Sequence, residues 1–468
     1  MPAKRTAKQG SARRADAVQN RERVIAAARR LFDQTPGATL AEVAAAAGVS
    51  RSTLYRHFSD RRELLEALEE RSGGEDARRP DEPLPLGRLG RERPVALEAI
   101  QVFDVVAPPV LPEQLVAEAE RIAQVALALY VIDIDGSHLL RVAGPNRLPK
   151  RLEAPLAVGP EIDADGLSQL RERFRDYPGA EVVPLWLRGR AMGVMVTLGR
   201  ARPELPEIAR QAAAAVALAD QYTDTFARAR RRKQPKAAAE IQQSLLPPRI
   251  SRVTGGEVAG NVLPSYEVAG DWFDFVENLD GIWIALADGL GGGTRATASG
   301  AVALGALRAS RRSGGTIGEA LMVMHRTLKE MPGPRAEMSA VAARWDPPSG
   351  RLTVANCGHV PPIVIRADRR AEHLPVPRGP GLGGRSSPKP TERRSSLGPG
   401  DRLLMISDGV AAPGRGSAGL GVEGVIDAAL RSERGSAADS VRRVHTAVLE
   451  ASAGHLEDDA TVVCLAVS

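Results

Sequence analysis

The amino-acid sequence predicts a multidomain protein with an all-α segment first, a mixed α/β segment in the middle and a larger α+β segment last. At 468 residues the chain is too long for one hydrophobic core, and about three domains of ordinary size are expected. Apolar residues recur at helical spacing before residue 72, and strand-like and helix-like runs alternate after residue 94. A stretch rich in Gly, Pro, Arg and Glu separates these two patterns.

Composition indicates packed, globular domains. The chain is 43% hydrophobic and 26% charged, which excludes fibrous and wholly disordered classes. Its longest apolar runs, such as Val125 to Ile132, are far shorter than the roughly 20 residues that cross a bilayer. The basic N-terminus leads into no apolar secretory segment. We therefore expect a cytoplasmic protein with no membrane partner.

The two cysteines, Cys357 and Cys464, have no second Cys or His nearby at the spacing of zinc ligands. No disulfide framework or zinc site is therefore predicted. The net charge of +6 is uneven, because five basic residues precede the first acidic residue, Asp16. That N-terminal arm is either a contact for a polyanion or a solvated, disordered tail.

The predicted divisions of the chain follow these shifts in composition. They are a disordered basic arm at 1–17, an all-helical domain at 18–71, a flexible linker at 72–94, a mixed α/β domain at 95–203, a helical transmitter at 204–246 and a C-terminal domain at 247–468. The transmitter is Ala-rich, is expected to be broken or bent once at Pro235 and stops at Pro247-Pro248. The Pro/Gly/Ser-rich run from Pro377 to Pro399 is expected to be a surface loop.

The first domain has the order of a helix-turn-helix. One apolar face predicts the first helix, formed by Val24, Ile25, Ala28, Leu31 and Phe32. Thr39 and Glu42 have the spacing of a capping box, Gly48 then turns the chain, and Ser50 can cap the next helix. The residues expected to contact base edges and phosphates are Ser50, Arg51, Ser52, Thr53, Tyr55, Arg56 and His57.

This segment, "AAAAGVSRSTLYRHF" with its flanking helices, resembles the DNA-binding domain of TetR-type repressors. The resemblance implies that Tyr55 and His57 contact phosphates of double-stranded DNA. The all-helical dimerisation domain of TetR proteins does not follow, so we expect a homodimer formed through another part of the chain. The alternative is a helix-turn-helix that binds only protein.

The middle segment combines strand-like and helix-like runs. Strands are expected at Val125 to Ile134, His138 to Ala143, Ala180 to Leu187 and Ala191 to Leu198, and a helix at Leu115 to Ala123. The hairpin "VPLWLRGRAMGVMVTLG" resembles the closing hairpin of GAF sensory domains. No His or Cys set suits haem, so a small-molecule sensor and a ligand-free dimerisation domain remain open.

Four short motifs of the last segment each place an aspartate at the end of an apolar strand. They are "VAGDWFDF" with Asp271 and Asp274, "IWIALADGLGGG" with Asp288, "DRLLMISDGV" with Asp408, and "EDDATVVCLAV" with Asp458 and Asp459. Converging carboxylates are costly unless cations neutralise them, and an all-oxygen set favours Mg²⁺ or Mn²⁺. The neighbouring glycines are expected to leave space for waters and for a backbone carbonyl ligand.

In this order and spacing the motifs resemble the metal-dependent phosphatase 2C superfamily, and in particular its bacterial SpoIIE and RsbU branch. "AAEIQQSLLPP" and "ANCGHVPPIV" resemble further segments of that branch. The resemblance implies an α+β domain of four layers, with two packed β-sheets flanked by helices. It also implies a serine/threonine protein phosphatase acting on a phosphorylated anti-sigma-factor antagonist.

The resemblance further implies roles for individual residues. Asp271, Asp288 and Asp408 would ligate two divalent ions, Mn²⁺ or Mg²⁺, with Asp458 on the second ion and the Gly289 carbonyl completing the first. These four aspartates would be the catalytic set. Asp459 would stand behind the ligands, and His359 would be a general acid or, in the favoured interpretation, a structural or loop-positioning residue.

Two departures from the family pattern keep alternatives open. The chain has Ala269-Gly270-Asp271 where the family has Gly-Gly-Asp, and "DGLGGG" where it has "DVSGHG". One alternative is a TetR-like transcriptional regulator whose phosphatase domain is catalytically silent. Another is an active phosphatase whose N-terminal domain binds only protein. The favoured hypothesis joins phosphatase activity to DNA binding.

Overall fold

The computed structural model describes residues 24–28, 31, 40–50, 53–54, 57–58, 64, 106–153, 157–174, 177, 179–232, 234, 236–264, 270–411, 420–432 and 435–468. The chain divides into two compact units, Met1–Glu82 and Pro83–Ser468, and each is described by itself. No helix within the described ranges is both long enough and apolar enough to span a bilayer.

The N-terminal unit is a small helical core around α2 (Leu40–Ala47). The buried side chains include Val24, Ile25 and Ala28 of the predicted first helix, which pack with Leu54 and Phe58. The described part of this helix therefore buries the apolar face that its spacing predicts.

The turn after α2 also follows the predicted chemistry. Gly48 has φ +64°, and the Ser50 hydroxyl accepts a hydrogen bond from Thr53 N at 3.1 Å. The predicted Ser50 cap is therefore confirmed. Among the residues expected to contact DNA, Ser50 is exposed and Thr53 and His57 are half-buried. The others, together with Phe32 and Thr39, lie outside the described residues: Arg51, Ser52, Tyr55 and Arg56.

The middle region contains a five-stranded antiparallel sheet in the order β3-β2-β1-β5-β4. Its strands are β1 (Leu127–Ile132), β2 (His138–Ala143), β3 (Arg151–Glu153), β4 (Val182–Leu187) and β5 (Arg190–Thr197). Four of these strands lie where the sequence predicts them. Strand β3 was not predicted, because three residues with no buried side chain give no readable alternation.

Both faces of this sheet are covered. Helices α6 (Leu111–Ala123), α8 (Leu205–Ala219) and α9 (Thr225–Arg230) pack their apolar residues on one face. Helix α7 (Ala164–Arg173) covers the other face with Leu167 and Leu170. Every residue of β1 is buried, which explains why its sequence is a continuous apolar run.

The predicted transmitter has one interruption more than the single break or bend expected at Pro235. It consists of α8, α9 and α10 (Ala237–Leu245), with breaks at 220–224 and 231–236. Helix α8 buries an apolar face in the core of the middle sheet, so it belongs to that region rather than to a free connector. Helical propensity predicted the helices but could not place the breaks, because packing against the sheet decides where α8 ends. Pro235 itself lies outside the described residues.

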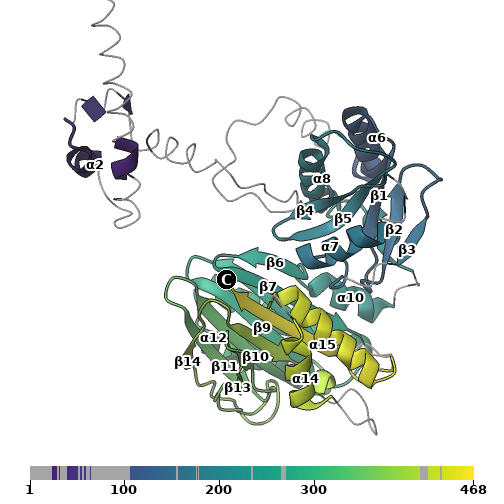
Figure 1. The fold of residues 1–468 in the computed structure, drawn as a ribbon. Helices are drawn as coiled ribbons and strands as arrows, with labels where there is room; N and C mark the ends of the chain where they lie inside the picture. Colours follow the sequence, from purple (N-terminus) through teal and green to yellow (C-terminus); the bar gives the residue numbers. More distant parts are fainter. Residues whose placement is uncertain are drawn as a thin grey trace, which may run out of the picture. The chain divides into compact units, whose positions relative to one another are not determined.

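The C-terminal region has two antiparallel sheets (Figure 1). The first has the order β14-β11-β10-β9-β8 and the second β13-β12-β15-β16-β7-β6. The strands are β6 (Ile250–Val253), β7 (Gly256–Leu263), β8 (Trp272–Asn278), β9 (Gly281–Gly289), β10 (Met338–Asp346), β11 (Arg351–Cys357), β12 (Ile363–Ile365), β13 (Ala371–His373), β14 (Arg393–Ser396), β15 (Arg402–Ile406) and β16 (Ala460–Val467).

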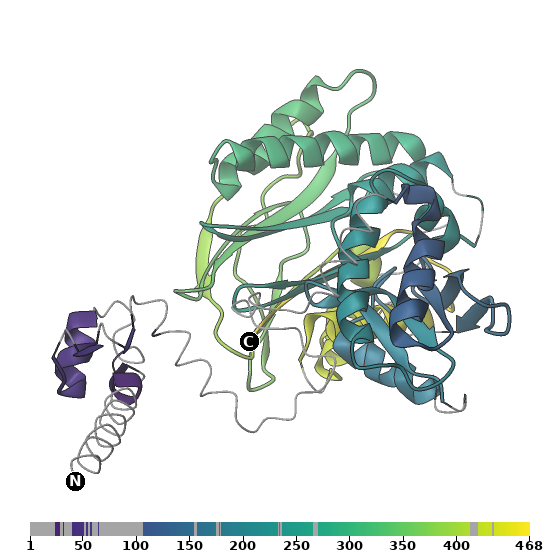
Figure 2. The same ribbon diagram turned by 90° about the horizontal axis from the view of Figure 1, so that it is seen from above.

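The two sheets pack face to face with helices on both outer sides. Side chains of both sheets, among them Ile284 and Leu465, share the central core. Helices α11 (Gly293–Arg312) and α12 (Ile317–Glu330) cover the first sheet, and they form one edge of the molecule in Figure 2. Helices α14 (Gly421–Leu430) and α15 (Ala437–Ala451) cover the second. The two packed β-sheets flanked by helices that were predicted for this region are confirmed.

The run Pro377 to Pro399 is not simply a surface loop. It contains β14, which pairs with the edge of the first sheet in the register Val354↔Arg393. The prediction failed because the arginines and serines of β14 lack an apolar alternation, as is usual for an edge strand. The same run also includes residues that line a cavity described below.

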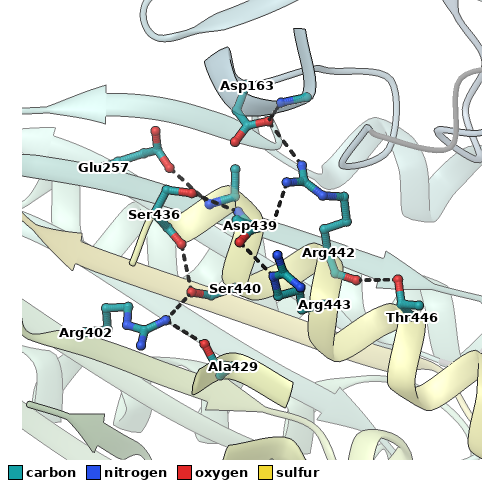
Figure 3. A network of polar contacts seen from close by, with 12 residues as sticks. Asp163, Glu257, Arg402, Ala429, Ser436, Asp439, Ser440, Arg442, Arg443 and Thr446 are labelled. Carbon is teal, nitrogen blue, oxygen red and sulfur yellow. Dashed lines mark hydrogen bonds and ion pairs between the residues drawn. The ribbon is translucent and has the colours of Figure 1, made fainter. Parts of the chain in front are cut away.

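The middle region contacts the C-terminal region through buried charges. Glu161 pairs with Arg190 at 2.9 Å and accepts a hydrogen bond from Ile250 N of β6 at 2.7 Å. Arg442 of α15 lies between Asp163, at 3.1 Å, and Asp439, at 2.6 Å (Figure 3). Buried charges are stable only when paired, so these contacts fix how the two regions meet.

Candidate active site

The four predicted aspartates lie where the strands of the two sheets end. Asp271 directly precedes β8 and Asp288 is the penultimate residue of β9, both in the first sheet. Asp408 is the first residue of the short helix α13 (Asp408–Ala411), which follows β15, and Asp458 precedes β16. The packing of the sheets therefore brings carboxylates from four separate motifs to one place.

Hydrogen bonds connect the strand ends that carry these aspartates. Ser407 N donates to Thr461 O at 2.9 Å, and Thr461 N donates to the Ser407 hydroxyl at 2.9 Å. The Thr461 hydroxyl then donates to Asp271 Oδ2 at 2.6 Å, which joins the second sheet to the first. The sequence analysis missed both residues, since nothing local distinguishes a Thr in a buried strand.

The glycines beside the aspartates serve close backbone packing. A Cβ on Gly270 would lie 3.2 Å from Gly289 Cα, and one on Gly409 would lie 2.3 Å from Asp459 O. Gly270, Gly289 and Gly409 therefore permit close backbone packing, a role that the sequence analysis did not predict; that they leave space for waters and a carbonyl ligand stays a prediction. They allow the loops to approach until the aspartates meet.

The carboxylates lie close enough to change one another's pKa values. Burial raises the pKa of Asp271 well above its usual range, and the charges of Asp288 and Asp459 raise it further. Burial and then the charge of Asp408 raise the pKa of Asp288 to about 7. Burial also raises the pKa of Asp458. A divalent cation among these groups would replace their repulsion with attraction.

The donor set fits a hydrated divalent ion. Asp271 Oδ1 is buried and has no hydrogen-bond partner among the described residues. Within the described ranges, no three Asp, Glu, His or Cys side chains are close enough to hold an ion by themselves. For an ion bound here, waters and a backbone carbonyl such as that of Gly289 would complete the coordination, a ligand set that suits Mg²⁺ and Mn²⁺.

Gln242 of α10 is a site residue that the sequence analysis did not identify. Its side chain is 1% exposed, and Nε2 donates to Asp271 O at 3.0 Å and to Asp459 Oδ2 at 2.6 Å. One helix thereby holds both the loop of Asp271 and the start of β16. Asp459 lies against Gln242, which fits its expected place behind the ligands. The motif "AAEIQQSLLPP" drew attention to this helix but not to the buried Gln.

Asp274 does not join the site, although it shares a motif with Asp271. It is 2% exposed on β8, and it pairs with Arg308 and Arg311 of α11, each at 2.8 Å. Arg308 also donates to Leu245 O at the end of α10. The arrangement is a buried ion cluster that holds α10 and α11 on the first sheet.

His359 has the contacts of a loop-positioning residue. Its backbone N donates to the Asn356 side chain at 2.9 Å, and Asn356 Nδ2 donates to His359 O at 3.0 Å. Nδ1 lies 3.1 Å from Val360 O and so carries the ring proton. Burial lowers the pKa of His359 to about 4, so the neutral ring has no proton on Nε2 to give near pH 7.

A cavity of about 310 Å³ opens beside the aspartates. Asp288 and Asp408 line it, together with Glu337 and Arg378, so acidic and basic side chains face the same space. A cavity lined by carboxylates and one guanidinium suits an anionic group that binds together with cations.

Comparison with known proteins agrees with this geometry. Residues 279–468 match the family model described as "Stage II sporulation protein E (SpoIIE)", and residues 24–68 match "Bacterial regulatory proteins, tetR family". The "Phosphoserine phosphatase RsbU" of Bacillus subtilis (strain 168) is 22% identical over 231 residues, which cover 49% of this chain and 68% of that protein.

Solved structures also match. The RsbU and RsbW domains of a Mycobacterium tuberculosis protein are 27% identical with a TM-score of 0.39, covering 46% of this chain and 60% of that chain. The PP2C phosphatase domain of SpoIIE from Bacillus subtilis, with a fragment of its regulatory domain, is 18% identical with a TM-score of 0.40, covering 45% and 62%. This chain thus spans less than two thirds of either. What the family models show is a SpoIIE-family segment at residues 279–468 and a tetR-family segment at residues 24–68.

Proposed function

We propose that the C-terminal domain is a metal-dependent protein phosphatase that hydrolyses phosphoserine or phosphothreonine in a partner protein. The observation that carries the proposal is the meeting of four aspartates from two sheets. Burial and neighbouring carboxylates raise the pKa values of Asp271, Asp288 and Asp458. The similarity to a phosphoserine phosphatase of Bacillus subtilis supports the same substrate class. A phosphorylated anti-sigma-factor antagonist is the proposed partner.

In this proposal Asp271, Asp288, Asp408 and Asp458 hold two divalent ions, Mn²⁺ or Mg²⁺, with the Gly289 carbonyl. Such ions supply the Lewis acidity that activates water and neutralises phosphoryl oxygens. The chain orients the carboxylates: the Thr461 hydroxyl binds Asp271 Oδ2 and leaves Oδ1 for coordination. Gln242 engages Asp459 and the Asp271 carbonyl, which keeps both loops in register.

The other regions are proposed to regulate this activity. The tetR-family match supports double-stranded DNA as a ligand of the N-terminal domain, and Ser50, Thr53 and His57 are described there among the proposed contacts. The middle region is proposed to be a GAF-like sensor or dimerisation domain at 95–203 that acts through the buried ion pairs of Glu161 and Asp163. A homodimer would present two DNA-binding domains to a palindromic site.

The decisive experiment measures phosphate release from a phosphoserine peptide and from an aryl phosphate, with and without Mn²⁺. Asp288→Asn and Asp408→Asn are expected to lower kcat by at least about 100-fold, because each removes a charged ligand. Asp280→Asn is the matched control, because Asp280 is half-exposed and pairs only with Arg344 and Trp283 among the described contacts. Turnover without added metal, or equal rates in all variants, would contradict the proposal.

The silent-phosphatase alternative predicts a different combination of results. Wild-type protein would bind DNA with an affinity that falls steeply as salt rises, and would release no phosphate under any metal condition. Phosphate release without salt-sensitive DNA binding would instead support the phosphatase whose N-terminal domain binds only protein. Measuring DNA binding and phosphate release on the full chain therefore distinguishes the three hypotheses.

A further inference from the structure

The cavity beside the aspartates has a marked asymmetry of charge. Three carboxylates line it, those of Asp288, Asp408 and Glu337. Arg378 is the single basic side chain among the described residues that line it. A phosphate monoester is a dianion near neutral pH, so Glu337 by itself would repel it.

Arg378 has no acidic partner among the described residues, unlike three other arginines of the C-terminal region. Arg308 and Arg311 are held by Asp274, and Arg442 is held by Asp163 and Asp439. Arg378 makes one contact within the described part of the chain, from Nε to Gly358 O at 3.0 Å. Its two terminal nitrogens therefore have no described partner, and the side chain is exposed to incoming molecules.

The backbone that carries Arg378 is fixed by the fold. Gly379 forms a parallel bridge with Cys357 at the end of β11. Leu382 exchanges two hydrogen bonds with Met338 of β10, at 2.7 and 3.1 Å. A Cβ on Gly358 would lie 3.0 Å from Gly381 Cα, so these two segments pack backbone against backbone. Arg378 is thus held in place by the backbone contacts of its segment and by the hydrogen bond from its Nε.

We propose that Arg378 binds the phosphate group of the substrate, with Nη1 and Nη2 donating to its non-bridging oxygens. A guanidinium presents two parallel N–H groups that match two phosphoryl oxygens, and such charge-assisted pairs are among the stronger hydrogen bonds. Asp288 and Asp408, which would hold the ions, line the same cavity. This inference rests on the proposed phosphatase function and names the residue that recognises its substrate.

The test compares Arg378→Gln with wild type in the full, Mn²⁺-loaded protein. We expect KM for a phosphoserine peptide, and the inhibition constant of inorganic phosphate, to rise together by about 10- to 100-fold, as for loss of a hydrogen bond to a charged group. Mn²⁺ affinity and Tm should stay at wild-type values. Arg378→Lys should recover part of the affinity for phosphate, because it keeps the charge but not the planar fork.

Arg385→Gln is the matched control, since Arg385 is exposed in the same segment but does not line the cavity. Unchanged KM and unchanged phosphate inhibition in Arg378→Gln would overturn the inference. A parallel loss of Mn²⁺ affinity would also overturn it, because Arg378 would then act by positioning the Gly358 segment.

Failure of the proposed function gives a separate result. If wild-type protein shows no turnover, calorimetric titration of the Mn²⁺-loaded protein with inorganic phosphate still tests Arg378. Binding that weakens about 10-fold or more in Arg378→Gln supports the inference without catalysis. No phosphate binding in wild type, or equal binding in both proteins, would refute it.

Discussion

At the scale of single residues, the site depends on how closely backbone segments approach. Gly270, Gly289 and Gly409 each stand where a side chain would strike a neighbouring loop. The aspartates beside them can therefore meet, and their mutual repulsion raises the pKa of Asp271 after the larger effect of burial. Cations bound as proposed would offset the cost of this arrangement, so metal binding is expected to stabilise the fold.

The prediction at this scale concerns Gly409. In Gly409→Ala the new Cβ would lie 2.3 Å from Asp459 O, so the start of α13 must move away from β16. We expect Mn²⁺ affinity to fall about 10- to 100-fold and the free energy of unfolding to fall by about 1–3 kcal/mol. Isothermal titration and urea unfolding measure the two effects.

Gly305→Ala is the control for this substitution. Gly305 lies inside α11, and a Cβ there would meet no atom within 4 Å. The same chemical change should stabilise the protein by about 0.5–1 kcal/mol, because Ala favours a helix interior. Equal behaviour of the two variants would show that Gly409 is not needed for close packing.

At the scale of elements, α10 joins the middle region to the candidate site. Its N-terminal part pairs Glu240 with Arg231, which follows α9, at 2.5 Å. Further along, Gln242 contacts Asp459 and the Asp271 carbonyl, and Leu245 O accepts from Arg308. A shift of α10 would therefore reach both the Asp271 loop and the Asp274 ion cluster.

The prediction for this element is that Gln242→Leu weakens the site through the helix. The variant removes the buried hydrogen bond from Gln242 Nε2 to Asp459 Oδ2, which costs about 1–3 kcal/mol of unfolding free energy. Mn²⁺ affinity should fall as well, and hydrogen exchange in α10 should rise. Ser244→Ala, on an exposed position of the same helix, should change the unfolding free energy by less than about 0.5 kcal/mol. Unchanged metal binding in Gln242→Leu would remove α10 from this role.

At the scale of the whole C-terminal unit, buried carboxylates lie where the middle region meets the phosphatase-like sheets. Burial raises the pKa of Glu161 and of Asp163, with Arg190 and Arg442 opposing the change. Burial also raises the pKa of Glu257, on β7, to about 7. Glu257 accepts a hydrogen bond from Ala438 N at the start of α15, close to the Arg442 network in Figure 3.

The prediction at this scale is a pH dependence of stability caused by Glu257. Its pKa is about 7 when folded, above the ordinary 4.5, so the folded state binds the proton more tightly. The stability this provides is complete below about pH 4.5 and is lost as pH rises through 7. Glu257→Gln should abolish this loss and be more stable than wild type at pH 8, by about 3 kcal/mol. Urea unfolding from pH 5 to 8 tests it, and parallel curves for the two proteins would contradict it.

Local sequence determined much of this protein. The apolar periodicity predicted the first helix and four strands of the middle sheet, and the residue type of Ser50 predicted a helix cap. Such signals act over a few neighbouring residues, so the sequence alone carries them. The motifs that join an aspartate to one end of an apolar strand correctly predicted that Asp271, Asp288, Asp408 and Asp458 lie at strand ends. Short or polar elements such as β3 and β14 could not be predicted, since pairing with a neighbouring strand decides them.

Only the tertiary structure decided which polar residues share the site. Thr461 reaches Asp271 across 190 positions, and Gln242 reaches Asp459 across 217, so no local pattern reports either contact. No local pattern shows that Asp274 pairs with two arginines and so lies outside the site. Nor does one show that Arg378, in a segment predicted to be a surface loop, lines the cavity. The sequence by itself determined the elements and their carboxylates. The packing of two sheets determined the neighbours, because desolvation and pairing of charge depend on distances that only the folded chain defines.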